Sequence, residues 1–180
     1  MFKSELAKDY FALFGITKSF EIDAGALAER YRFLQRQAHP DMHASGDPME
    51  KRIALQYSGY VNQAYSTLRD ANRRAFYLLE LGGFAENEVN SFPVDEEFLF
   101  EQMMLRDRIS DLCDCDDALS VIEEVTASLE RLQVDAEAKF LKFYQQDKLE
   151  QAAPFANCLQ YLFKMKEELD RSELKMLEEG

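Results

Sequence analysis

Hydrophobic residues recur along this chain at the three- and four-residue spacing of amphipathic α-helices. In the first half, this spacing predicts helices over about 5–14, 24–38, 50–68 and 72–81. The apolar positions of residues 24–38 share one face, and Asp23 is placed to cap the first turn. Gly15 and the Gly82-Gly83 pair end the first and last of these segments.

The second half of the chain favours long helices. From Val94 to Glu179 it has no glycine and one proline, Pro154, and its periodicity predicts helices over about 95–112, 117–146 and 149–178. Long helices with short connections are typical of an antiparallel bundle, so we predict an all-α chain ending in a three-helix bundle. Residues 84–94 lack a sustained period and are predicted to be a linker. The expected divisions are therefore 1–83, 84–94 and 95–180.

The predicted helix at 95–112 is apolar on two sides. At about 100° per residue, one side can pack into the bundle and carries Phe98, Leu105, Ile109 and Leu112. The opposite side carries Leu99, Phe100, Met103 and Met104, with Asp107 and Asp111 as a polar rim. We interpret this second side as an exposed protein-binding surface. The alternative is that the helix is buried on both sides, for instance against the N-terminal half.

Charge is unevenly divided along the chain. Residues 1–82 carry 11 Lys/Arg and 10 Asp/Glu, net +1, and residues 83–180 carry 10 and 24, net −14, which together make −13. The acidic half argues against nucleic-acid binding, which requires a basic surface. No run of about 18 apolar residues is present and the N-terminus lacks a signal-peptide core, so we expect a cytoplasmic protein that does not span a membrane.

The cysteines do not form a recognisable metal site. Cys113, Cys115 and Cys158 are odd in number and contain no CxxC pair, whereas a structural zinc site needs four ligands. Reduced, partly buried thiols are the interpretation we adopt, and we expect neither a metal nor a cofactor.

A His-Pro-Asp tripeptide, His39-Pro40-Asp41, follows the helix at 24–38. Pro40 has no N–H and pushes the preceding residue out of the helical region, so the helix must end there. One interpretation is a simple turn. A second is catalysis, with His39 as general base oriented by Asp41, although no serine or cysteine stands in a nucleophile motif.

A third interpretation rests on resemblance to J domains. Four pieces in order resemble that family: the opening 9–15 (DYFALFG), the cationic helix, the tripeptide at its end, and the segment 62–70 (NQAYSTLRD). The resemblance implies a co-chaperone, not an enzyme, that stimulates ATP hydrolysis by a seventy-kilodalton heat-shock chaperone. It implies that this chaperone is contacted by His39, Pro40, Asp41, Arg32 and Arg36. Ala38 and Met42 depart from the aromatic and the lysine that J domains usually have there.

Nearly the whole chain is similar to the HscB family, the J-type co-chaperones of iron–sulfur cluster assembly. The likeness is carried by residues 73–79 (RRAFYLL) and 95–109 (DEEFLFEQMMLRDRI). It implies an HscA-type chaperone and an IscU-type scaffold protein as partners. The implied scaffold-binding residues are Leu99, Phe100, Met103, Asp107, Asp111 and Tyr161. Met104 stands where the family often has glutamate. Two alternatives remain: a J-domain protein for another client, and an acidic interaction protein without a chaperone role.

Overall fold

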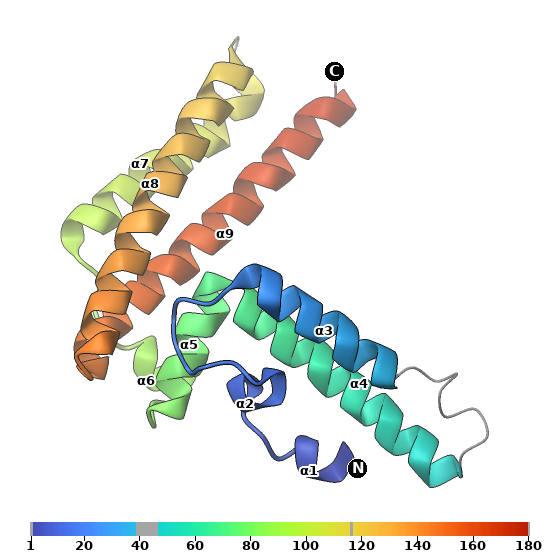
Figure 1. Ribbon diagram of the computed structural model, residues 1–180. Helices are drawn as coiled ribbons and strands as arrows, with labels where there is room; N and C mark the ends of the chain where they lie inside the picture. The colour runs from blue at the N-terminus through green and yellow to red at the C-terminus, as the bar shows by residue number, and fades with distance from the viewer. Residues whose placement is uncertain (1, 39–46, 116, 180) are drawn as a thin grey trace. The chain divides into compact units, whose positions relative to one another are not determined.

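The computed structural model describes residues 2–38, 47–115 and 117–179, and in these ranges the chain is helical with short connections (Figure 1). No strand occurs in the described ranges, so the all-α prediction is confirmed. The chain divides into two compact units, Met1–Leu78 and Leu79–Gly180. The helix α5, Ala71–Leu81, begins in the first unit and ends in the second.

The first unit is built around a helical hairpin. Helices α3 (Ala24–Ala38) and α4 (Pro48–Arg69) pack side by side, and the short helices α1 (Phe2–Glu5) and α2 (Tyr10–Phe14) contact α4 (Figure 1). The bounds predicted for α3 are confirmed. Its start is set by Asp23, whose carboxylate accepts a hydrogen bond from the N–H of Ala26 at 2.9 Å. The buried core includes Phe11, Phe14, Leu27, Leu34, Ala38, Tyr57, Val61, Ala64 and Leu68.

Polar contacts fix how α3 is rotated about its own axis. The Tyr31 hydroxyl donates to the Asn62 side chain of α4 at 3.0 Å, and the Ser58 hydroxyl donates to the Gln35 side chain at 3.0 Å. Tyr31 also stacks on Tyr65, with ring centroids 4.1 Å apart. Because successive helical residues are about 100° apart, holding this side against α4 turns the positions that follow Tyr31 and Gln35 away from it.

The single helix predicted at 5–14 is wrong, because the chain breaks between α1 and α2. The carboxylate of Asp9 accepts a hydrogen bond from the N–H of Ala12 at 2.9 Å, so Asp9 caps a new helix. The Tyr60 hydroxyl donates to the carbonyl of Lys8, which holds the break against α4. Helix α2 ends at Gly15, whose φ of 67° lies in the left-handed region that glycine adopts without strain.

The second unit contains the long helices α8 (Ala118–Gln145) and α9 (Leu149–Glu179), with α7 (Glu96–Ser110) packed against both. A short 3-10 turn, η2 (Asp111–Asp114), leads from α7 toward α8. The buried residues include Leu105, Ile109, Leu112, Val125, Leu129, Leu132, Phe140, Leu159, Leu162 and Met165. The prediction of three long helices in this half is confirmed, with bounds shifted by one or two residues.

The segment 84–94, predicted to be a linker, contains the short helix α6, Glu86–Val89. Val89 is buried, and the side-chain amide of Asn157 on α9 donates to the carbonyls of Val89 and Phe92 at 2.9 and 3.0 Å. The segment is therefore held on α9 by side-chain hydrogen bonds. Its helix is too short to show a period in the sequence.

Candidate functional site: two protein-docking surfaces

The first candidate surface belongs to the α3 helix. His39, Pro40 and Asp41 lie outside the described residues, so their role stays a prediction. The predicted cationic contacts Arg32 and Arg36 are exposed, as is Arg30 on the flank. Together with Ala26, Glu29 and Phe33 they line a hollow of about 520 Å³ on the outer side of α3. The face opposite the α4 contact is therefore positively charged and open to a partner.

Phe33 is a member of this surface that sequence reasoning missed. Its ring is 40% exposed, and the guanidinium carbon of Arg30 lies 5.0 Å from the ring centroid. Such a cation–π contact orders the arginine and leaves an apolar ring among charges. The available signal was an aromatic residue directly after Arg32 on the polar side of an amphipathic helix.

The second candidate surface lies on α7. The apolar face of α7, defined here as Leu99, Phe100, Met103 and Met104, is between 39% and 62% exposed. Asp107 and Asp111 on the same side are also exposed. On the inner side, Leu105, Ile109 and Leu112 are buried, while Phe98 is partly exposed. The exposure predicted for this face is therefore confirmed within its own unit.

Tyr161 brings a second helix to the same surface. It lies on α9, is 38% exposed, and its ring centroid is 6.4 Å from that of Phe98 at a tilt of 49°. The structure therefore brings the predicted contact on α9 beside the start of α7. An aromatic ring next to thioether and leucine side chains is typical of a protein-binding patch.

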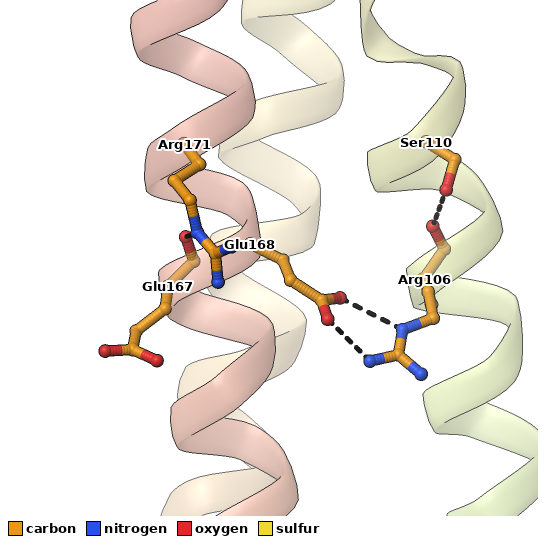
Figure 2. Close-up of polar contacts among 5 residues, drawn as sticks. All are labelled: Arg106, Ser110, Glu167, Glu168 and Arg171. Carbon is orange, nitrogen blue, oxygen red and sulfur yellow. Dashed lines mark hydrogen bonds and ion pairs between the residues drawn. The ribbon is translucent and has the colours of Figure 1, made fainter.

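Ion pairs pin both edges of α7 and leave its apolar face outward. On one edge, Glu101 pairs with Arg131 and Arg108 pairs with Glu124, both on α8. On the other edge, Figure 2 shows Arg106 of α7 and Glu168 of α9 reaching toward one another. That pair is bidentate, with Nε and Nη2 of Arg106 donating at 3.0 and 2.6 Å. Exposed pairs are worth about 0–1 kcal/mol each, so they orient the helix more than they stabilise it.

The charges at the α9 edge reinforce one another. The hydrogen bond from Arg106 lowers the pKa of Glu168, and the nearby charge of Arg171 lowers it further. The same bond raises the pKa of Arg106. Both groups therefore stay ionised near neutral pH, and the contact persists as an ion pair.

Within the part of the chain that the structure describes, the thiols and carboxylates do not gather into a metal centre. Among the described residues, no three of His, Cys, Asp or Glu lie close enough to hold a metal ion. Burial raises the pKa of the Cys158 thiol to about 12, which keeps it protonated and unreactive. Nor does any helix of the described ranges combine the length and apolarity needed to cross a membrane.

Comparison with known proteins gives one consistent result. Residues 94–170 match the family model described as the HSCB C-terminal oligomerisation domain. The chain is 36% identical over 168 residues to the co-chaperone protein HscB homolog of Shewanella loihica, covering 92% of this chain and 97% of that protein. It is 32% identical over 170 residues to co-chaperone protein HscB of Proteus mirabilis, covering 94% and 98%.

Solved structures agree with this result. The chaperone HscB from Vibrio cholerae has a TM-score of 0.82 and 31% identity, covering 94% of this chain and 99% of that one. The human co-chaperone HscB has a TM-score of 0.84 and 27% identity, covering 94% and 84%. The likeness therefore spans both compact units.

Proposed function

The chain belongs to the HscB family of co-chaperones and is not itself an enzyme, and we propose that it couples an HscA-type chaperone to an IscU-type scaffold protein. In this proposal the first unit stimulates the chaperone's ATPase, and the second unit delivers the scaffold as the client. The reaction takes place in the cytoplasm, on the partner chaperone.

The first unit supports its proposed role through charge. Arg32 and Arg36 present a cationic helix face directly before the tripeptide His39-Pro40-Asp41 in the sequence. A basic patch attracts an acidic surface, raising the rate of encounter more than the final affinity. In our proposal the cationic face steers the chaperone, and the tripeptide then triggers ATP hydrolysis.

The apolar face of α7 is the observation that carries the scaffold assignment. Four large apolar side chains and Tyr161 are substantially exposed in a unit that otherwise carries a large excess of acidic residues. Exposed apolar clusters of this kind mark protein interaction sites. We infer that the scaffold packs on Leu99, Phe100, Met103 and Tyr161, with Asp107 and Asp111 as charged contacts at the border.

Joining the two activities in one chain explains why both units are needed. Once the second unit holds the scaffold, engagement of the chaperone by the first unit raises the scaffold's effective concentration at the chaperone's substrate site. ATP hydrolysis then traps the client. No iron–sulfur ligand is required from this chain for such a transfer.

An ATPase assay of the cognate chaperone tests the proposal with this protein alone, the scaffold alone and both together. We expect stimulation by this protein and a larger, synergistic stimulation with both. His39→Gln should abolish stimulation while leaving scaffold binding, measured by calorimetry, unchanged. No binding heat at scaffold concentrations of tens of micromolar would overturn the client assignment, and intact stimulation by His39→Gln would overturn the role of the tripeptide.

A further inference from the structure

Cations gather along the side of α9 that faces α7. Tyr161, Lys164, Glu168, Arg171 and Lys175 recur at three- and four-residue spacing, which places them along one side of the helix. Lys164, Arg171 and Lys175, named here the basic edge, are all exposed. Residues 83–180 carry only 10 Lys/Arg against 24 Asp/Glu, so finding these three on one side of one helix departs from the charge of the unit.

The far end of this edge contains a hollow between α7 and α9. It measures about 460 Å³ and is lined by Arg106, Ile109, Ser110, Glu168, Arg171, Ser172 and Lys175. Its charged groups are three cations and one carboxylate, which is 3 − 1, or net +2. The one carboxylate, that of Glu168, accepts two hydrogen bonds from Arg106 (Figure 2). The positive charges of Arg171 and Lys175 are therefore not balanced within the hollow.

The ion pairs within the described residues leave the basic edge available. None of them engages Lys164, Arg171 or Lys175. Arg171 donates through Nε to the backbone carbonyl of Glu167 at 3.0 Å, while the Glu167 carboxylate points away from Arg106 (Figure 2). That backbone bond uses one of the five N–H donors of a guanidinium.

The basic edge is continuous with the apolar face of α7. Contacts join α7 and α9 at two levels: Phe98 meets Tyr161, and Arg106 pairs with Glu168. These contacts are eight residues apart on α7 and seven on α9, so the helices run parallel there. Met103 lies between the two levels on α7, and Lys164 lies between them on α9. A protein resting on the apolar face would thus reach the basic edge.

We propose that the basic edge is the carboxylate-binding border of this docking surface and receives acidic side chains of the same scaffold protein. This inference rests on the proposed function. The apolar face is bordered by Asp107 on α7 and Asp111 directly after it, and on α9 it is bordered by cations. A partner that matches both borders carries cations on one side and carboxylates on the other, and reversed docking would place like charges together. The two borders therefore set the direction in which the scaffold binds.

Charge reversal tests the inference. Arg171→Glu/Lys175→Glu should weaken scaffold binding by about 5- to 30-fold at low ionic strength, because each attraction becomes a repulsion. The loss should shrink below about 2-fold near 0.5 M salt, where exposed charges are screened. Lys142→Glu/Lys148→Glu is the control with the same change in net charge. Lys148 directly precedes α9 and is 13 residues from Tyr161, a span of about 20 Å at the helical rise.

The outcomes separate this inference from the proposed function. If the wild-type chain does not bind the scaffold, the proposed function fails. If Met103→Ala weakens binding but reversal at the basic edge does not, the function stands and this inference is wrong. If an Asp→Lys or Glu→Lys substitution in the scaffold restores its affinity for Arg171→Glu/Lys175→Glu, the result identifies the paired carboxylate and supports this inference. If reversal changes only self-association, measured by light scattering, the edge serves a second copy of this chain and the inference is wrong.

Discussion

Truncating the apolar face of α7 should disconnect the scaffold without unfolding the protein. Phe100 is 62% and Met103 is 52% exposed, so each side chain has already gained part of its burial energy and can gain the rest on binding. Burying such a side chain completely is worth about 1.5–3 kcal/mol. The part still exposed therefore corresponds to about 1–1.5 kcal/mol for each residue, available to a partner that covers it.

The double variant Phe100→Ala/Met103→Ala should then lose about 2–3 kcal/mol of binding free energy. Since about 1.4 kcal/mol is a factor of ten, the Kd for the scaffold should rise about 30- to 150-fold. The free energy of unfolding should change by about 1 kcal/mol or less, because substitutions of largely exposed side chains have small effects. Titration calorimetry measures the first quantity, and urea denaturation followed by circular dichroism measures the second.

Leu119→Ala provides the matched control. Leu119 is 74% exposed in the first turn of α8, so its truncation removes exposed apolar surface from another helix, as each single truncation on α7 does. We expect its Kd for the scaffold to match the wild type within about 2-fold. A double variant that remains folded and binds as tightly as Leu119→Ala would refute the assignment of the α7 face.

Three further predictions concern contacts within the units. Arg106 lowers the pKa of Glu168, so their ion pair stabilises the fold above the ordinary carboxyl pKa. This contribution is lost as the pH falls through the lowered pKa of Glu168. In urea denaturation, Glu168→Gln should therefore cost up to about 1 kcal/mol at pH 7 and nothing in strong acid. Burial raises the pKa of Tyr77 to about 12. The un-ionised Tyr77 therefore contributes fully to stability below the ordinary tyrosine pKa, and this contribution is lost as the pH rises toward 12. Tyr77→Phe should remove that ionisation from an ultraviolet titration. Asn157→Ala should cost about 2–4 kcal/mol and speed hydrogen exchange in α6, whereas Asn87→Ala, an exposed change in α6, should do neither.

Much of the fold was predictable because its helices are long and amphipathic. The bounds of α3 follow from its apolar stripe and the Asp23 cap, both local in sequence. The predictions fail where a residue distant in sequence determines the local structure. Asp9 begins a new helix at a point that Tyr60 of α4 holds in place, and α6 is held on α9 by Asn157. Neither partner is close in sequence to the segment it orders.

One large apolar residue of α8 lies outside the buried stripe of that helix. Leu119 is exposed because it is six residues from the buried Val125, which at about 100° per residue puts it on a different side. Ala118 is the residue buried in that turn. Spacing identifies a face reliably only when it is measured from residues known to be in the core.

The docking surface shows the same division between local and distant information. Periodicity groups Met103 with Leu99 and Phe100 on one side of α7, but the contacts of α7 with α8 and α9 decide that this side faces outward. The basic edge could be recognised only once α9 was placed beside α7. The net charge of the acidic half is strongly negative and does not indicate that three cations share one side of a helix. Electrostatic borders of a surface therefore depend on which helices are neighbours, and composition alone does not contain that information.

The ion pairs along α7 explain how an apolar face stays outward in a folded unit. A helix that is apolar on two sides offers either side for burial against its neighbours. Glu101 and Arg108 reach α8 from one edge, and Arg106 reaches α9 from the other. Rotation would break these contacts and leave several charges without partners, while the observed orientation satisfies them and keeps Leu105 and Ile109 inside. The pairs thus act mainly by selecting one of two rotations, and that selection exposes Phe100 and Met103 to a partner.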